Sequence, residues 1–535
     1  MQASFLDISS RLTFFCIHVV YTQIDNLSYL RLSPVALRDK ARIRYVMAIS
    51  IDTFFLDPDS QGTLQAQIQQ MIAQGILAGR YGKGEKLPSS RKLAMHLGIS
   101  RITVTLAYTE LLSNDYLTSR GRSGYFVSQN APEPPKFAPQ VKRTEAVDWS
   151  RAIGQKFTGG SAPTKPVDWQ KYKYPFIYGQ VDKTLFDHAN WRLCALQALG
   201  ARDFSALTAD YYDQDDPQLI EFILRHTLPR RGIVARPEEV LITVGAQNAL
   251  WLTAQILLTQ RRTAAIEDPC YHALRDVLTQ SRCHLSPIPV DRDGIQPDLI
   301  EDGTDVIFTT PSHQCPTSAT MPHARRKQLL RRARDLEAII VEDDYEFEVS
   351  FLGAPMPALK SLDEDGRVIY VGSFSKSIFP GLRLGYLVGS EEFIREARAL
   401  RASVLRHPPG HIQRTTAYFL SLGHYDALVR KISKVYQKRR EIMENAIQEY
   451  GLEIAGSGVF GGSSFWMRAP ENVNTVELKH ALKRNDVLIE TGHPYFAASA
   501  GIMNYYRLAY SSISEELIPE GVKRITHEID QLSRQ

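Results

Sequence analysis

The residues best suited to chemistry follow a short apolar segment, Val368 to Val371, whose composition predicts a buried strand. Two small hydroxyl residues come next, Ser373 and Ser375, and Lys376 follows them directly. Arg383 stands seven residues further along the chain. Small hydroxyls, free backbone N–H groups and a bidentate guanidinium are groups that bind a phosphate. The spacing therefore predicts a phosphate site with a lysine beside it.

A lysine held beside a phosphate site is how a protein fixes pyridoxal phosphate. The phosphate anchors the ring, and the lysine amine forms a Schiff base with the aldehyde. For a lysine alone, a surface position after a core strand would be the better interpretation. The complete array, which also contains the breaker Pro380-Gly381, favours cofactor attachment at Lys376 instead.

Two further segments offer groups that this cofactor needs. The segment Glu239 to Val244 predicts a strand, and the turn after it opens a helix from Ala249 to Leu258. Such a helix N-terminus favours an anion, although a plain strand–helix turn is an equal alternative. The segment Leu336 to Val341 predicts another strand, with Asp343 just beyond it. A carboxylate at a buried strand end is costly unless paired, and a pyridinium nitrogen is a suitable partner.

Composition limits the remaining possibilities. With 535 residues, the chain is long enough for about two to four domains with ample core. Its five cysteines are scattered and form no C-x-x-C pair, so neither a disulfide framework nor a metal site is indicated. This usage is typical of a reducing cytosol. No apolar run approaches the ~18 residues needed to span a membrane.

Residues 1–46 are expected to be an upstream extension without function. The apolar patch Leu12 to Tyr21 suggests a signal peptide, but His18 interrupts it and no small-residue cleavage site follows. A more regular stretch opens at Met47. A genuine additional helix in residues 1–46 is the alternative.

Residues 47–127 predict a small domain of three helices and a hairpin. Apolar residues recur at helical spacing from Gly62 to Gly79, which predicts the first helix. A second, short helix begins at Ser89-Ser90, and Ser100 caps the third, from Arg101 to about Asn114. Two short helices joined by a glycine-containing turn make a helix-turn-helix.

The hairpin, Tyr116 to Val127, has a Gly-rich basic tip and predicts a wing. From Arg80 to Val127 eight residues are basic and three are acidic, so the net charge of +4 conceals a basic module. We expect it to bind double-stranded DNA, with the third helix at base edges and the wing at phosphates. A helical bundle that binds no DNA is the less favoured alternative. The candidate DNA contacts are Ser90, Arg91, Ser100, Arg101, Thr103, Arg120 and Arg122.

A proline-rich linker, residues 128–173, separates this module from a large domain. It contains six prolines and Gly159-Gly160, which indicates an extended, flexible tether. Helical and strand patterns alternate through residues 174–530, as in an α/β fold with a largely parallel sheet.

The string from Gly84 to Leu117 resembles the winged helix-turn-helix of GntR-type bacterial regulators. With the lysine motif, the chain is similar to the MocR/GabR subfamily over about Gly62 to Ile529. The resemblance implies an N-terminal α+β winged helix-turn-helix followed by an α/β, fold-type I, aminotransferase-like domain that uses pyridoxal phosphate. It also implies a bacterial cytoplasmic protein and a homodimer, with a head-to-tail domain swap as one possible form.

The resemblance also assigns roles to individual residues. Ala246 and Gln247 correspond to a phosphate loop of the cofactor, and Tyr271 to an aromatic residue near its ring. In the motif Glu342 to Tyr345, the family's aspartate that pairs with the ring nitrogen is Asp343, and Tyr345 donates to the ring hydroxyl. Asp344, between them, has a helix cap or a surface charge as the alternative. By itself, Arg507 would be interpreted as a surface residue of a strand, with its stem packed on apolar neighbours and its charge in water. In the family this position clamps the carboxylate of the amine ligand.

The chain departs from the family pattern in several places. Ser318 replaces a usual glycine, and Cys315 a common aromatic residue, in the loop that resembles T-P-S-H-Q-x-P-T-G. The segment Tyr211 to Pro217 lacks the family's glycines, which puts the local loop and the pocket rim in question. The small, polar stretch Gly461 to Trp466 is expected to line the ligand pocket, with a plain turn as the alternative.

The implied function is a transcription regulator that senses an amine or amino acid through external aldimine formation, in which the amine displaces Lys376. A working aminotransferase with an appended head, and a sensor of pyridoxal phosphate itself, would use the same cofactor residues. Catalysis needs neither the intact DNA-binding head, residues 47–127, nor the long tether, residues 128–173. Their presence favours a regulator with at most slow transaminase activity. Arg507 is compatible with GABA, taurine and other amines or amino acids.

Overall fold

The structure, a computed structural model, describes residues 48–57, 62–133, 147–158, 165–208, 210, 212–353, 356–458, 460–498 and 501–534, without the side chains of residues 122, 205 and 206. The predicted extension, residues 1–46, lies outside these ranges, as does Tyr211. The chain divides into two compact units, Met1–Gly154 and Gln155–Gln535.

The first unit contains the three expected helices, α2 (Leu64–Leu77), α3 (Ser90–Leu97) and α4 (Arg101–Ser113). Each begins at a hydroxyl side chain that accepts a backbone N–H hydrogen bond, as expected for N-caps; these are Thr63, Ser89 and Ser100. Helix α3 ends at Gly98, whose φ of +66° is the left-handed conformation that favours glycine. This residue produces the tight turn between α3 and α4.

A two-stranded wing follows the helices. Strands β1 (Leu117–Ser119) and β2 (Tyr125–Val127) pair antiparallel, with Leu117 opposite Val127. Both of these residues are buried in one apolar cluster with residues of all three helices. The cluster therefore holds the wing against the helix-turn-helix.

The second unit is built on an eight-stranded sheet of order β4-β11-β10-β9-β8-β5-β6-β7. Strands β10, β9, β8, β5 and β6 run parallel, and β11 and β7 are antiparallel to their neighbours. The strand bounds are Val240–Thr243 (β4), Thr263–Asp268 (β5), His284–Asp291 (β6), Gly294–Ile295 (β7), Val306–Thr309 (β8), Ile339–Asp344 (β9), Val368–Ser373 (β10) and Gly385–Val388 (β11).

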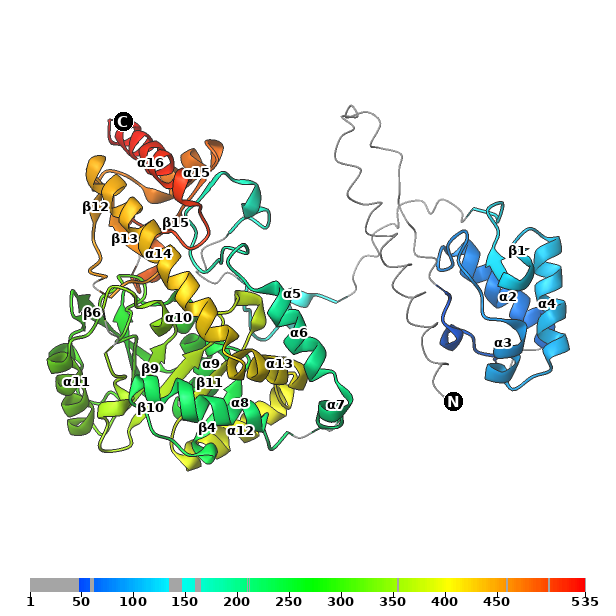
Figure 1. The fold of residues 1–535 in the computed structure, drawn as a ribbon, viewed down its shortest axis with the longest axis horizontal. Coiled ribbons are helices and arrows are strands. Elements are labelled where there is room, and N and C mark those ends of the chain that lie inside the picture. Colours follow the sequence, from blue (N-terminus) through cyan, green and yellow to red (C-terminus); the bar gives the residue numbers. More distant parts are fainter. Residues whose placement is uncertain are drawn as a thin grey trace, which may run out of the picture. The chain divides into compact units, whose positions relative to one another are not determined.

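Helices cover both faces of this sheet (Figure 1). Within β10, Ile369 and Val371 belong to the cluster that includes residues of α9, whereas Val368 and Tyr370 belong to clusters on the other face. This alternation explains why the strand is apolar throughout. The helices in this part of the chain, not all of which contact the sheet, are α6 (His188–Ala198), α7 (Ala201–Leu207), α8 (Pro217–Phe222), α9 (Ala246–Leu257), α10 (His272–Gln280), α11 (His323–Asp335), α12 (Glu391–Leu405) and α13 (Gly410–Ser421).

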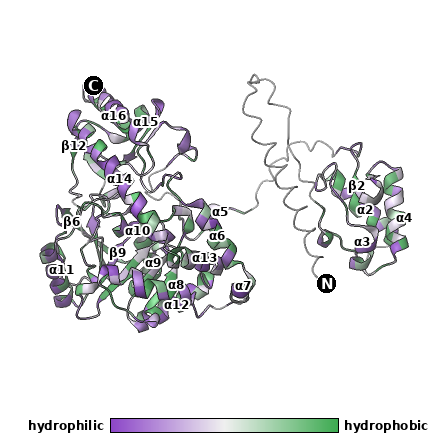
Figure 2. Ribbon diagram, in the orientation of Figure 1, coloured by the Kyte–Doolittle hydropathy of each residue, from purple (hydrophilic) through white to green (hydrophobic). Residues whose placement is uncertain are grey.

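A smaller C-terminal part follows α14 (His424–Glu449), the long helix that leads from the main sheet toward it in Figure 1. It holds a four-stranded antiparallel sheet of order β12-β13-β16-β15. Helix α16 carries hydrophilic and hydrophobic residues in alternation along its length, as expected for a helix with one buried face (Figure 2). The remaining bounds are Glu453–Ile454 (β12), Ser464–Arg468 (β13), Thr475–Arg484 (α15), Glu490–Thr491 (β15), Tyr505–Ala509 (β16) and Ile518–Ser533 (α16).

The segment that lacks the family's glycines is fixed by ion pairs instead. Asp215 is buried and contacts Arg398 at 2.8 Å and Arg401 at 2.6 Å. Asp216 caps α8 by accepting N–H hydrogen bonds from Gln218 and Leu219. The described residues of this segment, 212–217, thus join α8 to α12 and do not line the cavity that holds Lys376.

No helix in the described ranges is both long enough and apolar enough to cross a membrane.

Candidate functional site

A cavity of about 320 Å³ lies at the carboxyl ends of the sheet strands in the second unit. This edge of an α/β sheet is where ligands usually bind, because loops and helix N-termini converge there. All ten residues that the sequence predicts for cofactor or effector binding line the cavity: Ala246, Gln247, Tyr271, Asp343, Tyr345, Ser373, Ser375, Lys376, Arg383 and Arg507.

One side of the cavity is suited to an anion. Gly245 has a φ of +79°, which lets the chain turn sharply from β4 into α9. Helix α9 starts at Ala246, three residues earlier than predicted, and has no side-chain cap at its N-terminus. Its first N–H groups therefore remain available beside Ser375 and Arg383, and the helix dipole adds to their attraction for a phosphate.

Asp343 enters the cavity because of the strand alternation in β9. Its neighbours Glu342 and Asp344 point to the opposite face, where both oxygens of Glu342 accept backbone N–H groups and Oδ2 of Asp344 accepts from Arg231. Burial, together with the nearby carboxylate of Asp344, raises the pKa of Asp343 to about 7. Its Oδ1 atom is buried and has no hydrogen-bond partner among the described residues. A cationic ring nitrogen is the kind of partner that would stabilise this carboxylate.

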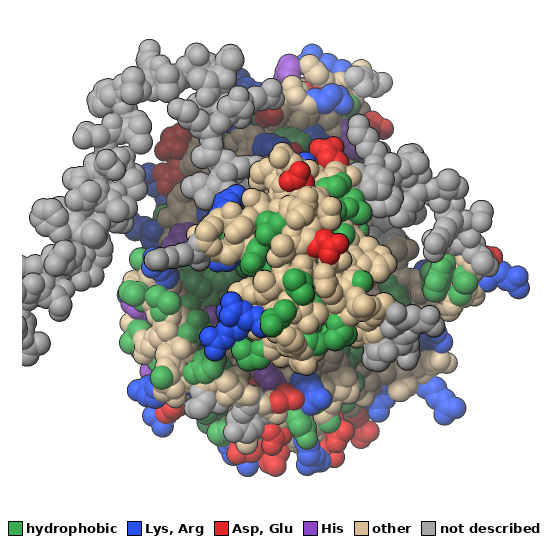
Figure 3. All heavy atoms as spheres, turned by 90° about the vertical axis from the view of Figure 1, so that its right-hand side faces the viewer, with side chains coloured by type: hydrophobic (Ala, Val, Ile, Leu, Met, Phe, Trp, Pro, Cys, Tyr) green, Lys and Arg blue, Asp and Glu red, His purple; other side chains and the backbone are tan. Residues whose placement is uncertain are grey.

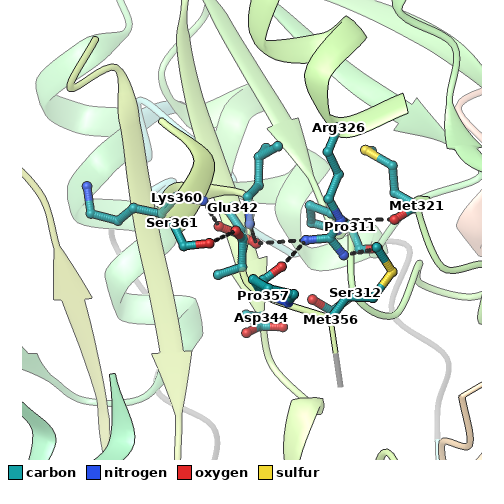
Figure 4. A network of polar contacts seen from close by, with 12 residues as sticks. Pro311, Ser312, Met321, Arg326, Glu342, Asp344, Met356, Pro357, Lys360 and Ser361 are labelled. Carbon is teal, nitrogen blue, oxygen red and sulfur yellow. Dashed lines mark hydrogen bonds and ion pairs between the residues drawn. The ribbon is translucent and has the colours of Figure 1, made fainter. Parts of the chain in front are cut away.

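The opposite face of β9 is held by two buried arginines. Glu342 accepts the backbone N–H groups of Leu359 and Lys360, both at 2.8 Å. Arg326 lies beside it and donates to the carbonyls of Pro311, Met321 and Pro357 (Figure 4). These contacts satisfy the donors of Arg326 inside the protein, as a buried charge requires. They hold the strand in the register that directs Asp343 into the cavity.

The second arginine, Arg231, pairs with Asp344, which is therefore neither a helix cap nor a surface charge. Asp344 is 2% exposed and accepts hydrogen bonds from Arg231 Nε and from the Tyr370 hydroxyl, both at 2.7 Å. Arg231 also donates to Ser312 Oγ at 2.7 Å. The pair joins β9 and β10 to the loop after β8, directly behind the cavity wall.

Lys376 follows β10 and lies next to Tyr178, with its Nζ atom 3.9 Å from the ring centroid. Burial lowers the pKa of Lys376 to about 8, although the carboxylate of Glu346 opposes this shift. A lower pKa increases the neutral fraction of the amine near neutral pH, and the neutral amine is the form that attacks a carbonyl. Lys376 is therefore suited to act as a nucleophile.

Arg507 reaches the cavity from β16, in the C-terminal part. Its guanidinium lies 3.4 Å from the centroid of the Tyr178 ring, and its Nε donates to Ser464 Oγ at 2.8 Å. Its Nη2 atom is buried and unpaired within the described part of the chain. A planar donor that is oriented by its neighbours and still has a free N–H edge is suited to a carboxylate or another acid group.

Several unpaired polar atoms converge on this cavity. Besides Asp343 Oδ1 and Arg507 Nη2, the hydroxyls of Tyr345 and Ser375 are buried without a hydrogen-bond partner among the described residues. Buried polar atoms without partners are rare in folded proteins. Their kinds match pyridoxal phosphate: an acid for the ring nitrogen, a phenol for the ring hydroxyl and a hydroxyl for the phosphate. The residues present therefore fit this cofactor.

Other residues that line the cavity lack a predicted role. They come from segments with no recognisable local pattern and reach the cavity only through the tertiary fold: Lys165, Tyr178, Gly179, His272, Glu490 and Tyr495. Cys315, noted in the sequence only as a departure from the family loop, also lines it. Burial lowers the pKa of His272 to about 4, so this ring is neutral near neutral pH.

The stretch Gly461 to Trp466 does not line the cavity among the described residues, contrary to expectation. Its Ser464 instead accepts the hydrogen bond that orients Arg507. Trp466 packs on the ring of Tyr495, which does line the cavity. The stretch therefore supports the ligand-facing residues from behind.

In the head, the predicted contact residues occupy the starts of α3 and α4 and the wing. Arg101 is exposed in the first turn of α4, and the Ser100 hydroxyl accepts the N–H of Ile102 at 3.1 Å. Thr103 is half-buried, and Arg91 is exposed on α3. Arg120 stacks on Phe126 in the wing, with 4.6 Å from its guanidinium carbon to the ring centroid.

Ser90 is the least accessible of the predicted DNA contacts whose exposure is described, at 8%. The side chain of Arg122 lies outside the described residues. Large apolar side chains are also exposed on α3 and α4, namely Met95, Ile102 and Leu106. Figure 3, in which the head faces the viewer, shows hydrophobic side chains interspersed with charged ones on its surface.

Comparison with known proteins identifies both units. Residues 64–127 match the family of bacterial regulatory proteins called gntR, and residues 193–525 match aminotransferase class I and II. The chain is 54% identical to the HTH-type transcriptional regulator TauR of Rhodobacter capsulatus, over 90% of this chain and 99% of that protein. It is 31% identical to the rhizopine catabolism regulatory protein MocR of Rhizobium meliloti, over 72% and 78% of the two chains.

Solved structures agree on the fold of the second unit. LysN, an α-aminoadipate aminotransferase of Thermus thermophilus, covers 72% of this chain with its full length, at a TM-score of 0.64 and 27% identity. A kynurenine aminotransferase of Pyrococcus horikoshii aligns over the same share, at a TM-score of 0.65 and 24% identity. With a gntR head before an aminotransferase fold, and with TauR and MocR as relatives, the chain belongs to the MocR/GabR subfamily of GntR-type transcription regulators.

Proposed function

We propose that this regulator carries pyridoxal phosphate on Lys376 and uses it to sense a primary amine or amino acid. The observation that carries the proposal is the set of unpaired buried atoms on Asp343, Tyr345, Ser375 and Arg507, which converge on one cavity with Lys376. When bound, the cofactor supplies an aldehyde that condenses reversibly with amines. The fold, which is that of pyridoxal phosphate-dependent enzymes, supports the proposal.

The residues divide the work of binding between them. The N-terminus of α9, with Ala246 and Gln247, holds the phosphate together with Ser373, Ser375 and Arg383. Asp343 pairs with the ring nitrogen, Tyr345 donates to the ring hydroxyl, and Tyr271 flanks the ring. Lys376 supplies the amine that an effector amine replaces, and Arg507 binds an acid group of that effector.

Binding of the heads to DNA depends on this replacement of Lys376 by the effector amine. A ligand can shift an equilibrium between two arrangements only by its differential affinity for them. We therefore infer that the amine-bound and amine-free cavities favour different arrangements of the tethered heads on the operator. We also infer that the chain acts as a homodimer, in which two heads read two half-sites.

A working aminotransferase is the second candidate, because the similar solved structures are aminotransferases and the cavity retains a lysine able to move a proton. The two functions differ in how long the bound state lasts. A sensor needs the effector-bound state to persist, whereas an enzyme must release its product. A product assay run beside operator binding on the same protein separates them: we expect operator binding to respond to the amine while keto-acid formation stays very slow.

The Arg507→Ala variant is expected to keep its colour and lose its response to acid-bearing amines. The cofactor contacts assigned above do not involve this guanidinium, whose Nη2 has no partner among the described residues. Loss of a charge-assisted hydrogen bond pair corresponds to about 2–3 kcal/mol, or a 30- to 150-fold weaker effector response. Spectral titration with an acid-bearing amine measures it; an unchanged titration curve would contradict the assignment.

The head is tested by two arginine variants. Arg101→Ala should weaken operator binding by ~1–3 kcal/mol and relax sequence preference, if this residue contacts a guanine edge in the major groove. Arg122→Ala should weaken binding to all sequences and reduce the salt slope by about one unit, as expected for a lost phosphate contact. Binding measurements at several salt concentrations distinguish the two. If both variants bind like the wild type, the assigned DNA-contacting surface is wrong.

A further inference from the structure

Lys165 is a residue of the predicted linker, residues 128–173, yet its side chain enters the cavity of the second unit. Its Nζ lies 2.9 Å from Glu490 Oε1 and also donates to the backbone carbonyl of Tyr178. The Lys165 side chain is 28% exposed and that of Glu490 is 4% exposed, so the pair closes part of the cavity wall. The end of the tether is thus joined to the cavity by an ion pair.

Glu490 connects this lysine to Arg507. The two residues are register partners in the β15–β16 ladder. Between their side chains, the Tyr495 hydroxyl donates to Glu490 Oε2 at 3.4 Å and receives a hydrogen bond from Arg507 Nη1 at 3.5 Å. One polar chain therefore runs from the tether lysine through an acid and a phenol to the arginine that faces the effector.

The polar series from Lys165 to Arg507 carries an excess of positive charge. Lys165 and Arg507 contribute two positive charges, and Glu490 contributes one negative charge. An acid group that enters beside Arg507 offsets this excess of positive charge at a site where Arg507 and Glu490 are almost fully buried, and where opposite charges interact more strongly than in water. Without Lys165, the carboxylate of Glu490 would repel that acid group.

Lys165 also lies close to the amine that the effector replaces. A Cβ built on Gly179 would be 3.1 Å from Lys376 Nζ and 3.7 Å from Lys165 Nζ. Gly179 has a φ of +74°, and both lysine amines lie within 4 Å of the position that a side chain would occupy there. An amine that takes the place of Lys376 therefore has its acid end within the reach of both Lys165 and Arg507.

We propose that Lys165 is a second cationic contact for the acid group of the effector, shared with Glu490, and that it selects acid-bearing amines over amines of equal length that lack an acid. This inference rests on the proposed function. Because the lysine belongs to the tether, the effector touches the segment that leads to the DNA-binding head. Sharing of Lys165 between Glu490 and the effector couples effector binding directly to that segment.

The experiment compares matched probes on full-length, cofactor-loaded protein. The pairs are 4-aminobutanoate with 1-aminobutane and 3-aminopropanoate with 1-aminopropane, and the readout is the dissociation constant from the change in cofactor absorption. The acid preference is the dissociation constant of the amine without an acid divided by that of its acid-bearing partner in each pair. Lys165→Met should lower this ratio about tenfold, as expected for the loss of one charged contact. Lys165→Arg should retain it, since the charge and the Glu490 pair are kept.

Two further variants complete the test. Lys171→Met removes a lysine of the same segment that lies on the surface beside Asp168, and it should leave the ratio unchanged. Glu490→Gln removes the competing carboxylate and should raise the ratio, which tests the inference even if Lys165→Met does not fold. An unchanged ratio in Lys165→Met and Glu490→Gln, with loss of preference in Arg507→Ala, overturns the role of Lys165 and leaves the proposed function intact. Absence of acid preference in the wild type would instead contradict the acid contact of the proposed function and this inference with it.

Discussion

The Lys376→Ala variant is expected to purify without the yellow colour of the wild type and to give no spectral response to amines. Lys376 is the lysine whose position after β10, beside the anion-binding helix terminus, allows a covalent bond to the cofactor. The remaining contacts are noncovalent and should release the cofactor on dialysis. Absorption spectra after dialysis, with operator binding in the presence of amine, measure the loss.

Lys376→Arg is the control that keeps a positive charge while removing the nucleophilic amine, and it should be equally colourless. Loss of colour in both variants, with a normal unfolding transition, would assign the effect to the chemistry of the amine. A dialysed Lys376→Ala protein that still showed the wild-type absorption band would contradict the assignment.

Arg231→Leu is expected to lower the free energy of unfolding of the second unit by about 3–5 kcal/mol. Arg231 and Asp344 are each about 1% exposed at the side chain, and removal of one partner leaves a buried charge without compensation. Tyr370 still donates to Asp344, but it cannot replace the cation. Denaturant unfolding monitored by tryptophan fluorescence provides the measurement.

The neighbouring arginine is a matched control for this prediction. Arg230 pairs with Asp426 at 2.9 Å, with side chains 49% and 31% exposed. Arg230→Leu should cost less than about 1 kcal/mol, because water screens such a pair. A similar loss in the free energy of unfolding for the two variants would mean that burial of the Arg231–Asp344 pair adds nothing to the stability of the second unit.

Local patterns were enough to predict the parts of the site that depend on adjacent residues. The strand, small hydroxyls and lysine around Ser375 and Lys376 form one continuous segment, so their geometry follows from the strand and turn that contain them. The helix caps at Ser89 and Ser100 were predicted for the same reason, since a cap depends only on the residues that follow it.

The rest of the site depends on contacts between distant segments. Lys165, Tyr178 and Glu490 meet at the cavity from positions up to about three hundred residues apart, and no local periodicity marks any of them. Asp344 was left open as a cap or surface charge, because its partner Arg231 lies more than a hundred residues away. Long-range ion pairs of this kind are set by topology, which residue spacing in the sequence does not reveal.

The most direct test of the central claim is a peptide map of the borohydride-reduced protein. Reduction fixes the cofactor to the lysine that holds it, and digestion with mass spectrometry identifies that residue. Attachment of the cofactor at Lys376 predicts bleaching of the yellow colour and a single labelled peptide that contains Lys376. A label on any other lysine, or colour that borohydride does not bleach, would contradict it.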